Sequence, residues 1–329
     1  MSKPTIKDIA KALDINISTV SRALKNHPDI STALKVKVQT FAESLGYTPN
    51  ESAVNLRKGK SLTIGIIVPE ISIYFFPSVM QAVEEVTHEK NYHLMVLHSN
   101  DSLEREKRNA HICSTVGVDG LLVSLSKETK NLQHFNNLTA NHVPIVYFDK
   151  VLHHEKNFKV TIQGEQAAFD AVEHLFSDNQ PKKVLGIFGD ERLSITQDRL
   201  IGFKKGLKKW GNGQTENIIF ANNAFVAASE FEKIYTSPNQ PDALFVMSDE
   251  ILSGVCQVIK NQDIQVPKNL KIVAMSDGII PQVLNFNVPY IHTSGYQLGR
   301  TAIHLLFDLI EKKEKEPGTL FIETPLIDK

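Results

Sequence analysis

The sequence predicts a small all-α domain at the N-terminus, followed by an α/β core with two doubly wound parallel sheets. Two observations predict this division: short helical patterns rich in basic residues fill residues 1–60, and apolar runs alternate with helical patterns from residue 62 onward. A length of 329 residues also suggests more than one domain. With 42% hydrophobic and 22% charged residues, the composition is typical of a globular protein with a sizeable core.

Residues 5–24 predict two short helices joined by a turn. Apolar residues at the spacing of a helix with one buried side are Ile6, Ile9, Ala10 and Leu13. Residues 14–16 interrupt this pattern, and Asn16 is a suitable N-cap for a second helix starting at Ile17, because its side-chain oxygen can accept a hydrogen bond from a backbone N–H.

The second helix has two different faces. Val20, Ala23 and Leu24 form an apolar side that can pack on the first helix, and the outward side carries Ile17, Ser18, Ser21 and Arg22. A helix inserted in the DNA major groove needs small residues for close approach, hydroxyls for phosphates, and an arginine that can form two hydrogen bonds with guanine. An ordinary surface helical hairpin has the same spacing, so the pattern alone leaves both interpretations open.

A third helix is expected from a cap at Ser31 to Leu45, with a termination at Gly46. Its apolar side would consist of Leu34, Val38, Phe41 and Leu45. The connector, residues 50–60, could form a short helix at 52–57, but isolated helices under about 12 residues are marginal in water. The alternative is a flexible linker with solvated basic residues.

The charge is distributed unevenly. Residues 1–60 contain ten Lys and Arg against five Asp and Glu, net +5, whereas the rest of the chain has 26 against 32, net −6, consistent with the total of −1. Contact with a polyanion is therefore expected at the N-terminus.

The core is predicted from repeated strand and helix patterns. Strands are expected at 62–68, 93–97, 120–125, 144–149, 183–189, 216–221, 243–248 and 271–276. The helices between them are expected at 76–90, 102–116, 165–176, 195–209, 225–236 and 249–261. This βαβ order indicates parallel sheets covered by helices on both faces, with a change of sheet near residues 163–164 and a return near 291–294 that leads into a helix at 295–313.

Four stretches in the first 57 residues resemble the DNA-binding headpiece of the lactose/galactose repressor family: 5-TIKDIA-10, 19-TVSRAL-24, 46-GYTPN-50 and Ala53-x-x-Leu56. Asp14 stands where the family usually has Gly, but Asp tolerates turn conformations. The resemblance implies a helix-turn-helix in residues 1–48 and a hinge helix in 49–60, with Leu56 entering the minor groove. The implied DNA-binding residues are Thr5, Asn16, Ile17, Ser18, Thr19, Ser21, Arg22, Asn50, Ala53 and Leu56.

The remainder, residues 61–329, is similar to the family's effector core, which has the periplasmic sugar-binding fold. Supporting stretches include 118-VDGLLV-123, 148-FDK-150 and 199-RLIGF-203. One subdomain is expected at 61–163 with a return segment at 292–318, and the other at 164–291 plus the C-terminal end. The resemblance implies a homodimer, because no leucine heptad tail like that of the lactose repressor is present.

Effector contacts are expected just past the carboxyl ends of the strands. The candidates are Tyr74, Phe75, Asp149, Arg199, Ser248, Asp249 and Asp277. Tyr74 and Phe75 could stack on a sugar ring or pack in the core, and Arg199 lies in the family's Arg-x-x-Gly-Phe context. Ser248-Asp249 and Ser276-Asp277 depart from the family's usual Asn-Asp and Asp-Asp or Asp-Asn, so only a sugar or related metabolite is implied.

The expected function is a transcription regulator, most simply a repressor, that binds a near-palindromic operator in double-stranded DNA and responds to a small ligand. The alternatives are a sugar-binding protein of a transport system, which would need a signal peptide in place of the headpiece, and an enzyme on a doubly wound sheet. No Gly-rich phosphate turn, nucleophile elbow or metal-ligand spacing occurs, so no enzyme activity, cofactor or metal is expected. Cys113 and Cys256 are expected to be reduced thiols, and the chain is expected to be cytoplasmic without membrane contact.

Overall fold

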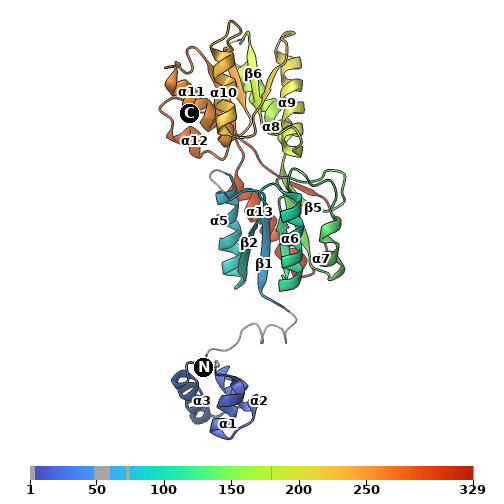
Figure 1. Ribbon diagram of the computed structural model, residues 1–329, viewed down its shortest axis with the longest axis vertical. Helices are drawn as coiled ribbons and strands as arrows, with labels where there is room; N and C mark the ends of the chain where they lie inside the picture. Colours follow the sequence, from blue (N-terminus) through green and yellow to red (C-terminus); the bar gives the residue numbers. More distant parts are fainter. Residues whose placement is uncertain (1–3, 48–59, 72–74, 179, 329) are drawn as a thin grey trace. The chain divides into compact units, whose positions relative to one another are not determined.

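The computed structural model describes residues 4–47, 60–71, 75–178 and 180–328. The chain separates into two compact units, Met1–Ser61 and Leu62–Lys329, whose elements are labelled in Figure 1. The described elements of the first unit are three helices, and the second unit contains two six-stranded sheets.

The first unit has the predicted helix-turn-helix. Its helices are α1 (Ile6–Leu13), α2 (Ile17–Leu24) and α3 (Thr32–Ser44). Its fully or nearly fully buried core consists of Ile9, Ala10, Val20, Ala23, Val38 and Ala42. Leu34 and Phe41 pack against this core as predicted, but Leu45 is 40% exposed because it lies beyond the last turn of α3.

The two predicted N-cap residues, Ser31 and Asn16, both occupy N-cap positions, but only Ser31 caps its helix with its side chain. Ser31 caps α3, since its Oγ accepts from Leu34 N at 3.4 Å. The prediction for Asn16 is wrong in detail: it occupies the N-cap position of α2, but its side chain makes no cap hydrogen bond, and its backbone oxygen accepts from Thr19 N and Val20 N. Asp14 takes the left-handed conformation, φ 52°, which lets the turn close without Gly.

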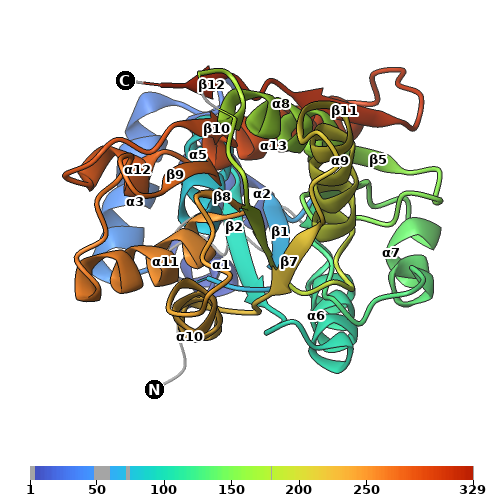
Figure 2. The same ribbon diagram turned by 90° about the horizontal axis from the view of Figure 1, so that it is seen from above.

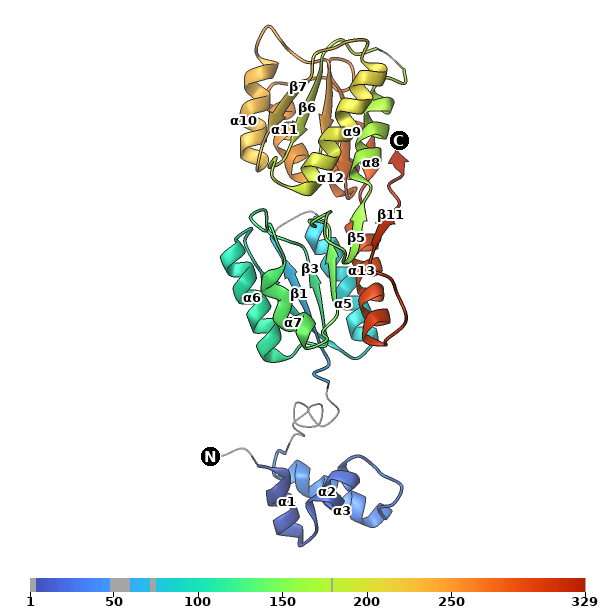
Figure 3. The same cartoon turned by 90° about the vertical axis from the view of Figure 1, so that its right-hand side faces the viewer.

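The first sheet of the core has the order β11-β5-β4-β3-β1-β2, with all its pairings parallel. Its strands are β1 (Thr63–Val68), β2 (His93–His98), β3 (Gly120–Val123), β4 (Ile145–Phe148), β5 (Phe158–Ile162) and β11 (Thr319–Ile322). Helices α5 (Phe75–Glu89) and α13 (Gly295–Ile310) cover one face, and α6 (Leu103–Val116), η1 (Gln133–Phe135) and α7 (Asn136–Ala140) cover the other (Figure 3).

Alternation along β1 explains why both faces of this sheet are covered. Ile64, Ile66 and Val68 point into the cluster with α5 and α13, whereas Ile67 points into the cluster with α6 and α7. All four side chains are fully buried. A run with no polar position is typical of a parallel strand buried on both faces.

The second sheet has the order β12-β10-β9-β8-β6-β7, parallel except for the antiparallel β10–β12 pair. Its strands are β6 (Val184–Phe188), β7 (Asn217–Phe220), β8 (Ala243–Val246), β9 (Lys271–Ser276), β10 (Tyr290–His292) and β12 (Leu326–Ile327). The paired helices α8 (Gly164–Leu175) and α9 (Ser194–Trp210) lie on one side, and α10 (Ala224–Tyr235) and α11 (Asp249–Asn261) on the other (Figure 2). The short α12 (Ile279–Val283) follows β9.

The chain crosses from one sheet to the other three times, after β5, after β10 and after β11. All eight predicted strands are present, but β5, β10, β11 and β12 were missed. The predicted return segment at 292–318 stops short of β11, which pairs with β5 in the first sheet. Helix α13 ends at Ile310, three residues before the predicted end at residue 313. Lys312, two residues beyond the helix, has a left-handed backbone conformation with φ 57°.

Both cysteines are free, with Cys113 buried and Cys256 half-buried, and burial raises the pKa of each thiol to about 12. In the described part of the chain, no helix is long and apolar enough to cross a bilayer.

Candidate functional site

In the N-terminal unit, α2 presents a polar surface opposite its buried side. Ile17, Ser18 and Arg22 are exposed, whereas Val20 and Ala23 are fully buried. No described residue pairs with the Arg22 guanidinium, so its donors remain available to a base edge. This is the arrangement that the outward face of a recognition helix requires.

The predicted phosphate-binding hydroxyls differ in their surroundings. Thr19 and Ser21 are half-buried beside this surface. The Thr5 hydroxyl donates to Asp8 Oδ2 at 2.7 Å, and Thr5 N donates to the same oxygen at 2.8 Å, so a phosphate would compete with Asp8 for the hydroxyl. These bonds lower the pKa of Asp8. Asn50, Ala53 and Leu56 lie outside the described residues.

The core contains a cavity of about 190 Å³ between its two sheets. Its walls are formed largely by residues that directly follow strands, because the carboxyl ends of both sheets face it. After strands of the first sheet these residues are Glu70, Asp101, Lys127, Asp149 and Lys150, and after strands of the second Gly189, Asp190, Ala221, Asn222, Met247, Ser248, Asp249 and Glu250. Met275 lines the cavity from within β9.

Arg199 lies in the second turn of α9 and lines this cavity, although it is only 7% exposed. One terminal nitrogen donates to Met247 O at 2.7 Å, whereas Nε has no acceptor among the described residues. Burial lowers the pKa of the guanidinium, and Asp149 is the largest opposing influence. A guanidinium held in the wall of a cavity is suited to a ligand oxygen.

Asp149 follows β4, lines the same cavity and is 7% exposed. Its backbone has φ 57°, a conformation that Asp tolerates better than most residues. Burial raises the pKa of this carboxyl, while the charges of Lys150 and Arg199 oppose the rise. Asp149 and Arg199, which the sequence predicted separately as effector residues, both line this cavity.

Four other predicted effector residues have different positions. Phe75, Ser248 and Asp249 line the cavity. The carboxylate of Asp249 is already engaged, since it accepts from the Ser276 hydroxyl and from Asp277 N at 2.8 Å. Tyr74 lies outside the described residues.

Asp277 is not part of the cavity wall. Its carboxylate accepts from the Ser78 hydroxyl on α5 and from Gly295 N at 2.8 Å, at the first residue of α13. Asp277 follows β9 of the second sheet, whereas both partners belong to helices that cover the first. Asp277, which was predicted to contact the ligand, instead joins the two lobes of the core, one built on each sheet.

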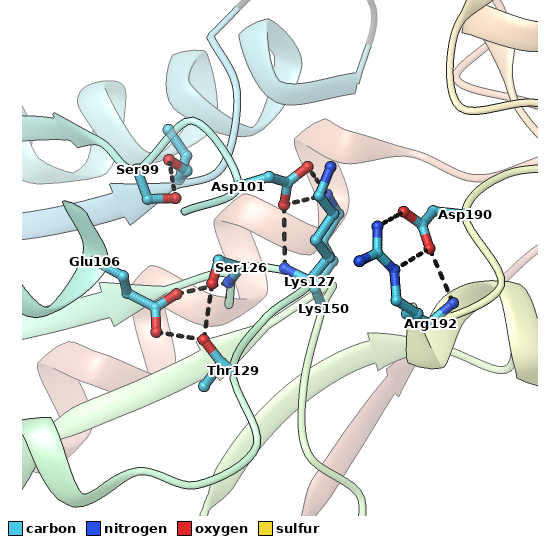
Figure 4. A network of polar contacts seen from close by, with 10 residues as sticks. Ser99, Asp101, Glu106, Ser126, Lys127, Thr129, Lys150, Asp190 and Arg192 are labelled. Carbon is cyan, nitrogen blue, oxygen red and sulfur yellow. Dashed lines mark hydrogen bonds and ion pairs between the residues drawn. The ribbon is translucent and has the colours of Figure 1, made fainter. Parts of the chain in front are cut away.

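Six charged lining residues were not predicted: Glu70, Asp101, Lys127, Lys150, Asp190 and Glu250. All follow strands, so the rule that selected Asp149 could have found them. Asp101 accepts from Lys127 N at 3.2 Å and from Lys150 Nζ at 3.4 Å, and Asp190 accepts two bonds from the Arg192 side chain (Figure 4). The Arg192 bonds lower the pKa of Asp190 to about 2.

A fully buried carboxylate supports the loop that carries Lys127. Glu106 on α6 accepts from Ser126 N at 2.6 Å and from the Thr129 hydroxyl at 2.7 Å (Figure 4), and it contacts His134 Nε2 at 2.8 Å. The side chain of Glu106 has no exposed area. These bonds hold residues 126–129 in one conformation beside the cavity.

Two family descriptions match parts of this chain. Residues 5–50 match the bacterial regulatory proteins of the lacI family, and residues 172–329 match the periplasmic binding protein-like domain. The first match covers α1 to α3, and the second covers all six strands of the second sheet together with α13 and β11.

Curated relatives match along nearly the whole chain. Catabolite control protein A of Priestia megaterium is 26% identical over 94% of this chain and 93% of its own length. The HTH-type transcriptional repressor CytR of Escherichia coli K12 is 26% identical over 98% of this chain and 94% of its own length. A crystal structure of the Lac repressor dimer bound to operator and the anti-inducer ONPF has a TM-score of 0.84, 19% identity, and coverage of 99% and 98% of the two chains, which is a similarity of fold.

Proposed function

The chain belongs to the lacI family of bacterial regulatory proteins and is a DNA-binding transcription regulator, and we propose that it is a homodimeric repressor controlled by a small polyhydroxylated ligand. The ligand, a sugar or sugar derivative, binds in the cavity between the two sheets. Regulation takes place in the cytoplasm, where the operator is accessible. The proposal has a DNA part and a ligand part, which rest on different residues.

For the DNA part, α2 enters the major groove. Arg22 forms two hydrogen bonds with a guanine, Ile17 and Ser18 tune the choice of half-site, and the hydroxyls of Thr19 and Ser21 contact phosphates. Thr5 also contacts a phosphate, and Asn16, at the start of α2, contributes a further DNA contact. Two subunits place their recognition helices in successive major grooves, about 34–36 Å apart, so the operator is a near-palindrome.

The hinge contacts of Asn50, Ala53 and Leu56 remain part of the proposal. An apolar wedge such as Leu56 would unstack one base step and bend the DNA. The ligand alters operator affinity by changing the angle between the two lobes. This change shifts the distance between the hinge segments, residues 49–60, of the two subunits. The coupling requires that the ligand bind one lobe arrangement better than another.

The observation that carries the ligand part is the buried wall formed by Arg199 and Asp149. The Arg199 guanidinium and the buried Asp149 carboxylate both belong to residues that line this cavity, and a ligand hydroxyl can accept from the first and donate to the second. Phe75 and Met247 supply apolar surface for the faces of a sugar ring. Ser248 and Asp249 complete the proposed ligand wall.

A transport protein and an enzyme are the competing functions. A sugar-binding protein of a transport system gives no role to α2 or to Arg22, which the family match accounts for. An enzyme would turn its ligand over. Incubation of purified protein with each bound ligand, followed by product analysis, is expected to return the ligand unchanged.

The test is binding of the full chain to its own upstream DNA, measured by fluorescence anisotropy at fixed salt with and without a panel of sugars. We expect nanomolar specific binding that one class of sugar weakens at least tenfold. The matched control is scrambled DNA of equal length and composition. Equal affinity for the two DNAs at every salt concentration would refute the DNA part, and specific binding that no sugar alters would refute the ligand part.

A further inference from the structure

A second cavity, of about 220 Å³, adjoins the ligand cavity. The two share Lys127, Lys150 and Leu193 as lining residues, so they meet at these side chains. Its walls come from the loops after β3 and β4 in one lobe and from the start of α9 in the other. A ligand seated against Arg199 could therefore extend past the two lysines into this space.

The two cavities differ in the charges of their walls. The described lining of the first contains six carboxylates and three cationic side chains, those of Lys127, Lys150 and Arg199. The described lining of the second contains no carboxylate, and its charged or titratable members are Lys127, Lys150, Arg192, His153 and His154. An uncharged polyol suits the first cavity, whereas the second suits an anionic group.

The cations around the second cavity are held from outside it. Lys150, whose side chain is 13% exposed, contacts Asp101, and Arg192 contacts Asp190. Neither carboxylate lines the second cavity, although both line the first. Supporting carboxylates of this kind orient a cation while leaving its remaining N–H donors free for a ligand.

Lys127 differs from these two cations. Its backbone N–H donates to Asp101 Oδ1, but its ammonium forms no ion pair with any described residue. Figure 4 shows Lys127 and Lys150 beside Asp101 near the Asp190–Arg192 pair. The half-buried Lys127, whose ammonium pairs with no described residue and which lines both cavities, is the strongest feature of this wall.

Helix α9 adds favourable partial charge at the same place. It is 17 residues long, begins at Ser194, and Ser194 lines the second cavity. The first backbone N–H groups of a helix lack intrahelical acceptors and favour an anion. The helix start reinforces the cationic wall.

We propose that the second cavity binds a phosphate monoester carried by the effector, held by Lys127, Lys150, Arg192 and the start of α9. This rests on the proposed function, since it identifies the effector as a phosphorylated sugar whose hydroxyls contact Asp149 and Arg199. The phosphoryl group lies beyond the two lysines and bridges the lobes, because Lys127 and Lys150 belong to one lobe and Arg192 to the other.

The first test is titration of the full chain with inorganic phosphate by calorimetry, in chloride buffer of constant ionic strength. We expect saturable binding with one site per chain, weakened at least tenfold by Lys127→Gln and by Arg192→Gln. Lys130→Gln is the matched control, because Lys130 is exposed, is close in sequence and lines neither cavity. This control should change the affinity less than twofold.

The second test compares a panel of hexoses, their phosphate monoesters and the corresponding sugar acids. At least one monoester should bind ten times more tightly than its parent sugar. Arg192→Gln, at a residue that lines the second cavity but not the first, should remove that advantage without changing the affinity for the parent. The proposal is overturned if phosphate does not bind saturably, if Lys127→Gln leaves its affinity unchanged, or if only sugar acids gain affinity.

Operator binding is measured on the same preparations to separate the two proposals. Loss of phosphate binding in Lys127→Gln together with intact operator binding supports both. Specific phosphate binding by a chain that does not recognise its upstream DNA would refute the proposed regulation while keeping the anion site. Specific operator binding without phosphate binding would refute the anion site alone.

Discussion

Replacement of Arg199 by Met should weaken the core much more than replacement of any exposed arginine. Arg199 is 7% exposed, donates to Met247 O at 2.7 Å and lies close enough to the buried Asp149 for their charges to interact. Removal of one member of a buried charge pair leaves the other uncompensated, which typically costs about 3–5 kcal/mol. The lost hydrogen bond is part of this total.

The assay is urea unfolding of the variants followed by circular dichroism. Arg192→Met is the matched control, because Arg192 is 59% exposed and its pair with Asp190 should contribute about 0–1 kcal/mol. The double variant Asp149→Asn, Arg199→Met removes both charges, so it should lose less stability than the two single changes combined. Equal losses for Arg199→Met and Arg192→Met, or additive losses in the double variant, would refute the assignment of a coupled buried pair.

Three further predictions concern other parts of the chain. Arg22→Ala should lose about 1–3 kcal/mol of discrimination per half-site, whereas Lys25→Ala should weaken specific and non-specific DNA equally, as measured by anisotropy on operator and mutated operator. Burial raises the pKa of the Glu250 carboxyl in the folded protein, so ionisation of this group lowers the free energy of unfolding as the pH rises through that pKa. Glu250→Gln should therefore be more stable than wild type at pH 7, and the difference should vanish below about pH 4. A stability advantage of the variant that persists below about pH 4 would contradict this explanation. Asp277→Asn should cost about 1–3 kcal/mol through its bonds to Ser78 and Gly295, and adding Ser78→Ala should cost little more; fully additive losses in thermal unfolding would show that no such bond forms.

Most of the sheet structure was predictable because buried parallel strands have continuous apolar runs. β1, β3, β4 and β8 have almost no exposed position, and all were found. β5 was missed because Lys159 interrupts its apolar run. That lysine is 6% exposed, and its ammonium donates hydrogen bonds to three backbone carbonyls of the preceding loop, those of Leu152, His153 and Glu155. No sequence pattern reveals that these carbonyls satisfy a buried ammonium.

The other missed strands lie at edges or are very short. β11 has two exposed apolar residues, Leu320 and Phe321, and β12 contains only two residues. Their strand conformation depends on pairing with β5 and β10, far away in the sequence. Local propensity is weakest where such long-range pairing decides the structure.

The sequence identified residues of the cavity wall where position after a strand determines a residue's surroundings. Asp149 and Ser248 were found in this way, and Lys127 and Glu250 could have been. Asp277 obeys the same rule but contacts the other lobe, because the crossing that leads into α13 passes beside it. The relative placement of two lobes depends on packing between distant segments, so sequence position alone could not distinguish a ligand contact from a lobe contact.

Occupancy of the core cavity and operator binding are expected to be coupled. Coupling is reciprocal, so a ligand that changes operator affinity by a given factor must have its own affinity changed by the same factor when operator is bound. The measurement is ligand titration of the full chain by calorimetry, with and without saturating operator. The factor by which operator changes ligand affinity should equal the factor by which ligand changes operator affinity, and both effects should be lost in Arg199→Met. A ligand affinity that saturating operator leaves unchanged would show that the two sites are not coupled.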